Sequence, residues 1–515
     1  MAENSWFKRT EKNDALVLLL TVFIIGLCTI VYELLIGSIS SYLMGDSIKQ
    51  FSITIGLSMT AMGLGSLLSR YLKKNLIQSF VWIEFSLGVL GGLSVPLLFI
   101  AYSQGAFYYP VMLSLIIAIG MLIGFEIPLL TRIMENNFSL RANISNVLSL
   151  DYFGALVAAL LFPFVLLPFL GIFKSAILTG TINIAVGSFN LWYFRASLSN
   201  LKSSKIKLIG IGSTVFMLGL FISADGLTQN WEDSLYEDRV IFSKQTPYQK
   251  IVLTKDRQDL RMYLDGSLQF SSIDEYRYHE SLAHIPLSSA QKRHQVLVLG
   301  GGEGLLLREI LKYRDINEIT VVDLDPEVAR LGKQQRLLVK LNADSLQNPK
   351  VKIVHQDAYS YLEQASQYFD VIIADLPDPK NSSLSRLYSK EFYKLIGKRL
   401  SRQGVFATQS TSPFFAKNAF WCIVSSVRAA GFFNVYPYHT YVPSFGDWGF
   451  VLASKQPIDL GELSVSVDTN YLESSRLVSL FHFPKDLRAE SDILPSSLNQ
   501  PKVLSFYLEG WRYYN

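Results

Sequence analysis

Acidic residues are distributed very unevenly along this 515-residue chain, and that distribution limits its fold more than any other feature. Of 43 acidic residues, only seven lie between Asn13 and Ala224: Asp14, Glu33, Asp46, Glu84, Glu126, Glu135 and Asp151. The same region contains apolar stretches long enough to cross a bilayer, at approximately 15–37, 51–72, 78–101, 108–131, 144–169, 173–194 and 206–224. We therefore predict a multi-span α-helical membrane domain of about seven helices, followed by a soluble domain.

Four carboxylates, Glu33, Glu84, Glu126 and Asp151, lie within or at the ends of the predicted spans. An unpaired charge is costly at that depth, so each needs an explanation. They either form a polar path or cation site, or pair with Arg132, hydroxyls or the backbone to hold the bundle together. The sequence favours neither alternative.

After Asp225 the long apolar runs give way to short alternating elements. Segments 239–242, 249–254 and 260–264 predict a small antiparallel β unit. Further strands are predicted at 295–300, 318–324, 351–356, 369–375 and 404–410, with 445–453 as a closing strand, and helices near 304–313, 326–340, 388–400 and 417–430. This alternation predicts an α/β Rossmann-like domain of the methyltransferase type, with ligands at the carboxyl ends of its strands.

These patterns divide the chain into an N-terminal tail (1–13), a transmembrane domain (14–225), a small β unit (226–290), a Rossmann-like domain (291–455) and a C-terminal appendage (456–515). A net charge of +4, with basic residues concentrated in membrane loops, gives little support to nucleic-acid binding. Two cysteines are too few for a disulfide scaffold, and six histidines without ligand spacing argue against a dedicated metal site.

A glycine-rich loop joins a predicted strand to a helix in the run QVLVLGGGEGLLLRE, residues 295–309. The next predicted strand ends at Asp323, where a carboxylate can hold ribose hydroxyls. A later strand of the same sheet ends in a second acidic cluster that contains Asp375 and Asp378. A nucleoside site beside paired carboxylates predicts an enzyme whose second substrate is a cation.

Glu303 lies inside the glycine loop and would repel a pyrophosphate. A carboxylate at this position suits a nucleoside that carries positive charge, such as S-adenosylmethionine or, better, its decarboxylated form. Two simpler explanations stand beside these functional ones: Glu303 caps the following helix, and Asp378 with Pro379 turns the chain.

Five runs resemble the spermidine synthase, or polyamine aminopropyltransferase, family: LDGSLQFSSIDEYRYHESLAHIP, VLVLGGGEGLLLREILKY, ITVVDLDPEV, FDVIIADLPDP and LYSKEFY. They occur in the family's order between roughly Tyr248 and Ser454. The membrane half resembles a bacterial branch in which a multi-span domain precedes the synthase domain. The resemblance implies transfer of an aminopropyl group from decarboxylated S-adenosylmethionine, a co-substrate rather than a resident cofactor, to an amine such as putrescine.

The resemblance also implies roles for individual residues. Asp375 accepts the proton or orients the amine, with Tyr278 beside it. The donor would be bound by Gln249, Gln269, Gly300, Gly301, Gly302, Glu303, Asp323, Asp357 and Ala358. The acceptor would be bound by Asp378, His279 and Gln409. The family usually has Asp at the position of Glu303, and often a tyrosine near Phe445, so these two departures bear on the acceptor more than on the reaction.

The partners expected are a small amine and the lipid bilayer, with a homodimer as one option for the oligomeric state. Basic residues precede the first predicted span and follow the second, fourth and sixth, which puts the N-terminus in the cytoplasm. With seven spans the soluble half would then face outward, whereas use of a cytosolic nucleoside favours a catalytic domain on the cytoplasmic face of the cell membrane, which we expect. A methyltransferase that uses intact S-adenosylmethionine, and a polyamine transporter or sensor, are the alternative functions.

Overall fold

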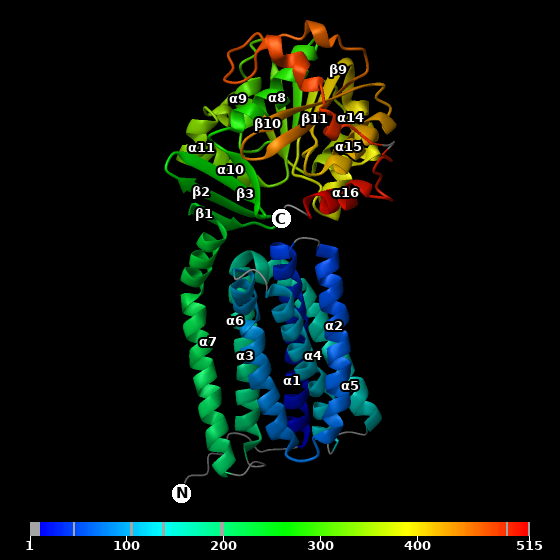
Figure 1. Ribbon diagram of the computed structural model, residues 1–515. Coiled ribbons are helices and arrows are strands. Elements are labelled where there is room, and N and C mark those ends of the chain that lie inside the picture. Colours follow the sequence, from blue (N-terminus) through cyan, green and yellow to red (C-terminus); the bar gives the residue numbers. More distant parts are fainter. Residues whose placement is uncertain are drawn as a thin grey trace. The chain divides into compact units, whose positions relative to one another are not determined.

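The computed structural model describes residues 11–44, 47–103, 107–135, 140–195, 200–490 and 493–512. It divides into two compact units, Met1–Glu237 and Asp238–Asn515 (Figure 1). Most of the predicted N-terminal tail, and Asp46, lie outside the described residues.

The first unit is a bundle of long helices: α1 (Glu11–Met44), α2 (Ser47–Leu68), α3 (Leu76–Ser103), α4 (Tyr108–Ile133), α5 (Leu140–Leu161), α6 (Leu167–Tyr193) and α7 (Asn200–Leu235). Two hydrogen bonds show that α1 and α6 are antiparallel. Asn183 of α6 accepts a hydrogen bond from Tyr32, and Tyr193, further along α6, donates to Asp14 near the start of α1.

Six segments of this unit are long and apolar enough to cross a membrane, and one of them, Arg141–Tyr193, has 53 residues. A straight helix of that length would measure about 80 Å, well over twice the hydrocarbon thickness of a bilayer. Gly171 has non-helical backbone angles, φ 71° and ψ 176°, and a π-helical turn at Phe162–Leu166 precedes it. The segment therefore contains two helices, α5 and α6.

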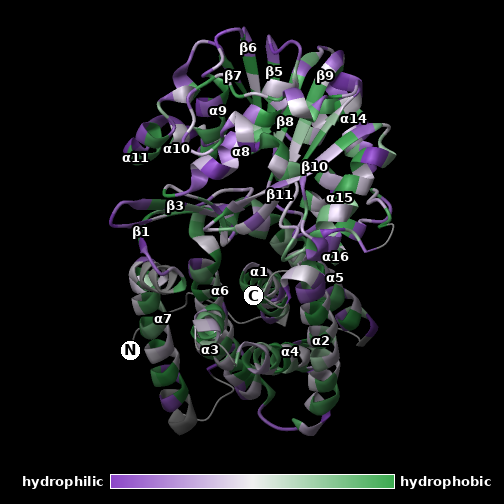
Figure 2. Cartoon of the chain, turned by 45° about the horizontal axis from the view of Figure 1, so that its top comes forward, coloured by the Kyte–Doolittle hydropathy of each residue, from purple (hydrophilic) through white to green (hydrophobic). Residues whose placement is uncertain are grey.

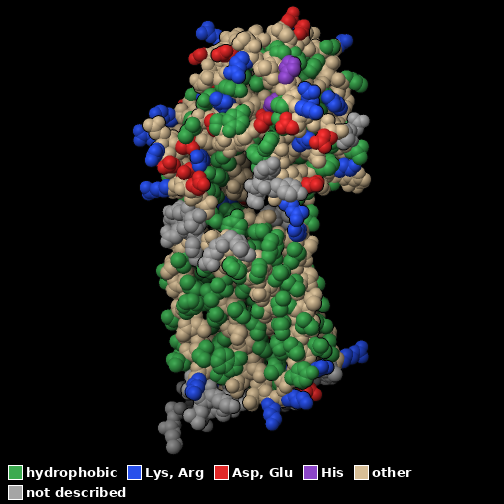
Figure 3. Space-filling model, in the orientation of Figure 1, with side chains coloured by type: hydrophobic (Ala, Val, Ile, Leu, Met, Phe, Trp, Pro, Cys, Tyr) green, Lys and Arg blue, Asp and Glu red, His purple; other side chains and the backbone are tan. Residues whose placement is uncertain are grey.

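The helices of the bundle consist mostly of hydrophobic residues (Figure 2). On the face seen in Figure 3, apolar side chains cover the bundle along its length, and Lys and Arg side chains gather at one end of it. Arg132, in the last turn of α4, donates to the carbonyl oxygens of Leu72 and Ser69, each at 2.9 Å. These carbonyls belong to the 3₁₀ turn at Ser69–Tyr71 and to Leu72 directly after it, so Arg132 binds the backbone that follows α2.

The second unit begins with a four-stranded antiparallel sheet in the order β1-β2-β3-β4. Its strands are β1 (Arg239–Gln245), β2 (Lys250–Asp256), β3 (Asp259–Leu264) and β4 (Ser267–Ser271). The helix α8 (Glu275–Ser289), which the sequence analysis does not predict, follows directly and packs on the large sheet.

The large sheet has seven strands in the order β10-β11-β9-β8-β5-β6-β7. Its strands are β5 (Gln295–Gly300), β6 (Glu318–Asp323), β7 (Val351–His355), β8 (Phe369–Asp375), β9 (Leu400–Gln409), β10 (Asn434–Val442) and β11 (Gly446–Ser454). Strands β5 to β9 are parallel to one another, whereas β11 is antiparallel to β9 and β10 is antiparallel to β11. This mixed sheet is Rossmann-like, with β10 as a strand that the sequence analysis missed.

Helices cover both faces of the large sheet. They are α9 (Leu305–Ile310), α10 (Pro326–Gln334), α11 (Arg336–Leu341), α12 (Ala358–Gln364), α14 (Lys390–Arg399) and α15 (Lys417–Ala429), besides α8. Leu297 and Leu299 of β5 belong to one core cluster and Val296 and Val298 to another, all fully buried. Both faces of the central strand are therefore covered, which explains its unbroken apolar sequence.

After β11 the chain forms short turns and ends in α16 (Lys502–Trp511). This helix packs against α15, and its Val503 is fully buried in the core. The C-terminal segment is thus an integral layer of the second unit.

Candidate active site

The glycine loop follows β5, which lies between β6 and β8. The chain passes from β5 to β6 on one side and reaches β8 on the other, and ligands bind at such a reversal of strand order. In the register of β5 and β8, Gly300 is paired with Asp375. Gly300 has a φ of +86°, and a Cβ atom there would lie 1.9 Å from the carbonyl oxygen of Asp375. Glycine is therefore required for the two motifs to meet.

Asp323 ends β6 beside the loop. Its Oδ2 accepts the N–H of Gly302 at 3.0 Å, and its Oδ1 accepts the N–H of Asp325 at 3.0 Å. Burial raises the pKa of Asp323 to about 6, although these two N–H groups oppose the shift. Gln249 donates to Asp325 at 3.2 Å, which brings the β1–β2 turn to the same strand end.

Glu303 does not cap the helix that follows it. Helix α9 begins after Gly304, and no side chain caps its first turn. Burial and then the negative charge of Asp375 raise the pKa of Glu303 to about 7, against the opposing effect of His279. A cationic ligand would stabilise the ionised form of Glu303, because its positive charge would offset both burial and the repulsion from Asp375.

His279 of α8 approaches the two acids from the other side. Its Nδ1 is 2.7 Å from Oε2 of Glu275, and its Nε2 is 3.9 Å from Oε1 of Glu303. Burial lowers the pKa of His279, but the hydrogen bond and charge of Glu275 outweigh burial, so the pKa is raised overall. Arg308 donates to both carboxylate oxygens of Glu275, at 2.8 and 3.0 Å. Arg308 and Glu275 therefore hold His279 in place next to the site.

Asp375 accepts a hydrogen bond from the Tyr278 hydroxyl at 2.6 Å. Burial raises the pKa of Asp375, while His279 and Tyr278 oppose the shift. The Tyr278 ring is flanked by Phe445 and Phe450, with ring centroids 6.1 and 5.3 Å away. Asp375 is thus a partly dehydrated carboxylate with a fixed orientation, which is what a proton acceptor needs.

Asp378 follows Asp375 on the loop after β8, and its hydrogen-bond donors are neutral side chains. Gln409 donates to Oδ1 at 3.2 Å, and Thr411 donates to Oδ2 at 3.1 Å. Burial raises the pKa of Asp378 to about 6, opposed by the hydrogen bonds of Gln409, Thr411 and Tyr507.

The other predicted site residues form local contacts. Gln269, on β4, donates to a carbonyl oxygen of its own strand at 3.0 Å. Asp357, after β7, caps α12 by accepting the N–H of Ser360 at 3.0 Å and also pairs with Arg386 at 2.5 Å. Ala358 is the buried first residue of α12. Asp357 is therefore a structural cap as well as a candidate ligand.

The sequence analysis missed Glu275, Thr411 and Tyr507. Glu275 is four residues before His279, a spacing that places both on one face of a helix, so prediction of α8 would have revealed the pair. Thr411 and Tyr507 carry no sequence signal, because only the fold brings them to Asp378.

His279, Glu303 and Asp375 offer ligand atoms that all lie within 4.8 Å of one another. One imidazole and two carboxylates form a donor set that divalent metals accept, and a carboxylate on the second imidazole nitrogen is common in metal sites. The spacing of histidines does not predict this group, because its members come from three distant segments. By charge, the cluster suits either an organic ammonium or a metal ion.

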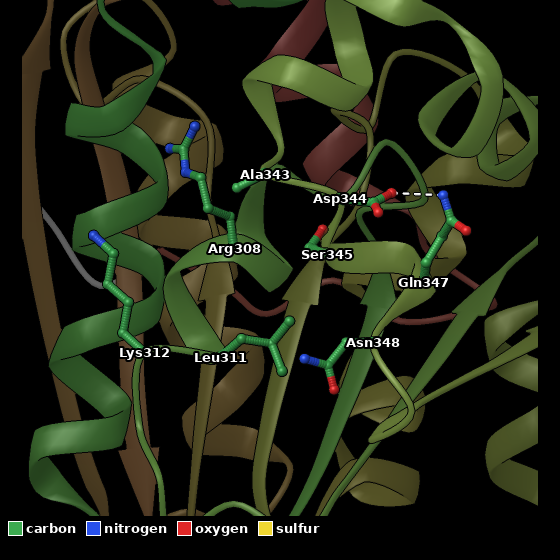
Figure 4. A pocket seen from close by; sticks show the side chains of 8 residues that line it. All are labelled: Arg308, Leu311, Lys312, Ala343, Asp344, Ser345, Gln347 and Asn348. Carbon is green, nitrogen blue, oxygen red and sulfur yellow. Dashed lines mark hydrogen bonds between the residues drawn. The ribbon is translucent and has the colours of Figure 1, made fainter.

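A separate open cavity of about 430 Å³ lies in the second unit, and Figure 4 shows the side chains that line it. It is lined by Arg308, Leu311, Lys312, Ala343, Asp344, Ser345, Gln347 and Asn348. Its two cations are already paired, Arg308 with Glu275 and Lys312 with Glu309. Ser345 donates to the carbonyl oxygen of Gly304 at 2.7 Å, so this wall supports the loop from outside the candidate site.

The helical unit contains its own buried polar chain. Tyr32 donates to Asn183 at 3.0 Å, and Asn183 donates to Glu84 at 2.8 Å. Glu84 also contacts the carboxyl group of Glu126, and the two side chains are 0% and 1% exposed. These buried polar side chains connect α1, α6, α3 and α4, with Glu84 and Glu126 as the pair of acids.

Comparison with known proteins gives a consistent result. Residues 275–462 match the spermine/spermidine synthase domain model. A polyamine aminopropyltransferase of Leptospira interrogans is 41% identical over 498 residues, covering 96% of this chain and 98% of that protein. A polyamine aminopropyltransferase of Oceanobacillus iheyensis is 39% identical, covering 95% and 96%. A solved spermidine synthase from Thermotoga maritima is 27% identical with a TM-score of 0.45, covering 48% of this chain and 87% of that chain.

Proposed function

This chain belongs to the polyamine aminopropyltransferase family, and we propose that it transfers an aminopropyl group from decarboxylated S-adenosylmethionine to a diamine such as putrescine. The products would be spermidine and methylthioadenosine. The observation that carries the proposal is the meeting of Glu303, Asp375 and the Tyr278 hydroxyl at the carboxyl ends of β5 and β8.

The donor binds along the glycine loop. Asp323 accepts the ribose hydroxyls, and Gln249 lies at the same strand end. Gln269, Asp357 and Ala358 complete the nucleoside side of the site. Glu303 binds the ammonium at the end of the aminopropyl chain, a contact that a carboxylate on that chain would weaken by repulsion. The site therefore selects the decarboxylated donor over S-adenosylmethionine itself.

The acceptor arrives as an ammonium ion and must lose a proton before it can attack. Asp375 takes that proton, while the Tyr278 hydroxyl fixes the carboxylate. The freed nitrogen lone pair forms a bond to the aminopropyl carbon attached to sulfur, and the carbon–sulfur electron pair leaves with methylthioadenosine. Asp378 and Gln409 hold the far ammonium of the diamine, which keeps the attacking nitrogen in line with the breaking bond.

A product assay tests this function. Detergent-solubilised protein is incubated with each donor and a panel of diamines, and products are identified by mass spectrometry. We expect methylthioadenosine and an aminopropylated amine, at the same rate with and without EDTA. Formation of S-adenosylhomocysteine instead of methylthioadenosine would contradict the proposal. Loss of activity with EDTA would assign a metal to His279, Glu303 and Asp375.

We also propose that the helical unit anchors the enzyme in a lipid bilayer. Its apolar helices and the basic residues at one end support this placement. Both native cysteines are buried, so a cysteine introduced at the exposed Tyr368 would give a single reporter for a membrane-impermeant thiol reagent. Labelling only after lysis would place the catalytic unit in the cytoplasm, and labelling of intact cells would place it outside.

A second candidate function, transport of a polyamine or of protons, is favoured by the buried pair of Glu84 and Glu126. Two acids in contact cannot both be charged without a cation or a shared proton. Flux into proteoliposomes that is lost in Glu84→Gln and Glu126→Gln would support transport. Flux no higher than that into empty liposomes would contradict the transport function.

A further inference from the structure

The loop at 376–381 carries Asp378 from the end of β8 to α13 (Ser382–Ser385). The first half of this loop is held by the Tyr388 hydroxyl, which donates to the carbonyl oxygen of Leu376 at 2.9 Å. The second half is held by a different part of the unit, the small antiparallel sheet. The position of Asp378 therefore depends on two separate anchors.

Lys380 makes the contact with the small sheet. Its Nζ donates to the Ser267 hydroxyl at 2.8 Å and to the carbonyl oxygens of Leu264 and Asp265, each at 3.3 Å. An ammonium has three N–H donors, so each of these acceptors can take one. Burial lowers the pKa of Lys380, although the charges of Asp265 and Asp378 oppose the shift. This ammonium is thus partly dehydrated and held by directed hydrogen bonds, unlike a lysine at the open surface.

The turn that receives Lys380 is itself fixed. Asp265 and Gly266 join β3 to β4 with φ of +48° and +75°, as a tight two-residue hairpin turn requires. Oδ1 of Asp265 accepts the N–H of Lys250 at 2.8 Å, and the N–H of Asp265 donates to the carbonyl oxygen of Lys250 at 2.9 Å. The turn therefore cannot shift without β2, the strand that begins at Lys250.

Both donor-side glutamines lie next to this turn. Gln249 directly precedes Lys250, and Gln269 donates to the carbonyl oxygen of Ser267 at 3.0 Å. The contact of Lys380 therefore connects the loop on the acceptor side of the candidate site to the hairpin on its donor side.

We infer that Lys380 is a positioning residue, which fixes the Asp378 loop against the β3–β4 turn and so sets where the acceptor lies relative to the donor. This inference rests on the proposed function, because it takes Asp378 as the partner of the acceptor's far ammonium. Lys380 acts through Asp378 rather than on the reacting atoms. A displacement of about 1 Å is enough to spoil in-line attack, so the acceptor should be affected far more than the donor.

The test is a double-mutant cycle with Lys380→Met, Ser267→Ala and the double variant. We expect kcat/KM for putrescine to fall about tenfold in Lys380→Met and about threefold in Ser267→Ala. The double variant should lose no more than Lys380→Met, because both changes remove the same contact. The Kd of methylthioadenosine, measured by calorimetry, should stay within about twofold of the wild type in all three, since the glycine loop and Asp323 remain in place.

Lys394→Met is the matched control, because Lys394 is exposed on α14 and the change removes the same charge from the same unit. It should leave kcat/KM for putrescine unchanged. Losses that multiply in the double variant, or an equal weakening of putrescine and methylthioadenosine, would overturn the inference. If Lys380→Met does not fold, Ser267→Ala decides alone, and an unchanged kcat/KM in that variant would overturn the inference as well.

Calorimetric titration of putrescine separates the two proposals. If the wild type makes no aminopropylated product but binds putrescine, and Lys380→Met weakens that binding while Lys394→Met does not, the proposed function fails and the role of Lys380 stands. If the wild type neither makes product nor binds putrescine, both fail.

Discussion

Both units of this protein bury carboxylates, but they surround them with different partners. In the second unit, Glu303 and Asp375 lie beside the raised-pKa imidazole of His279, which Glu275 and Arg308 hold in place. In the described part of the helical unit, Asn183 donates to Glu84, Glu126 lies beside Glu84, and one oxygen of each acid has no hydrogen-bond partner. The first arrangement leaves a net negative site open to a cationic substrate, whereas the second places two acids together with one neutral donor, Asn183. The same residue type therefore supports catalysis in one unit and, on our primary proposal, only packing in the other.

Removing the proton acceptor should have the largest effect on the catalytic side of this comparison. In Asp375→Asn, turnover should fall about 10³-fold, because the amide cannot accept the acceptor's proton. Donor affinity, measured by calorimetry, should stay close to that of the wild type. Near-normal turnover would show that Asp375 is not the proton acceptor.

The pH dependence of donor binding tests whether Glu303 must be ionised. The pKa of Glu303 is raised to about 7 in the free enzyme, so below this pH the group is mostly protonated and must release a proton when an ammonium binds. Affinity should therefore weaken about tenfold for each pH unit below 7 and level off above it. Methylthioadenosine lacks the ammonium and serves as control, and equal pH dependence of both ligands would exclude this role.

The Glu275→Gln variant tests whether the raised pKa of His279 depends on the negative charge of Glu275. Loss of the Glu275 charge should lower the pKa of His279, so that the imidazole becomes neutral at a lower pH. We expect turnover at neutral pH to fall about threefold to tenfold, with the pH–rate profile displaced toward acid. Unchanged turnover together with an unchanged imidazole titration, followed by NMR, would assign Glu275 to folding alone.

The smallest effect is expected from the acids of the helical unit. Glu84→Gln and Glu126→Gln should leave turnover in detergent within about twofold of the wild type, because they lie in a separate unit. A loss comparable to that of Glu275→Gln would mean that the two units are functionally coupled, and the contrast between their acids would no longer hold.

Local patterns were sufficient to predict most of the parallel strands. Strand 295–300 and strand 369–375 coincide with β5 and β8, because fully buried strands produce unbroken apolar runs. The predicted helix over 326–340 is instead two helices, α10 and α11, separated at Gln335. Strand β10 was missed because its polar and aromatic residues show no clear alternation, and its place is decided by pairing with β11.

The candidate site was only partly predictable, because local sequence patterns report on strand ends but not on contacts between distant segments. Glu303, Asp375 and Asp378 lie at strand ends, where a local motif reports on ligand binding. Glu275 and Arg308 are 33 residues apart in the sequence, and Asp378 and Tyr507 are further apart still. Only the tertiary fold brings the members of each pair together.

The most direct measurement of the central claim is equilibrium binding of decarboxylated and intact S-adenosylmethionine to the wild type and to Glu303→Gln. A site built on buried carboxylates should favour the decarboxylated donor by about a hundredfold, and the glutamine variant should lose most of that preference. Equal affinity of the wild type for both donors, or a preference that survives in Glu303→Gln, would contradict the account.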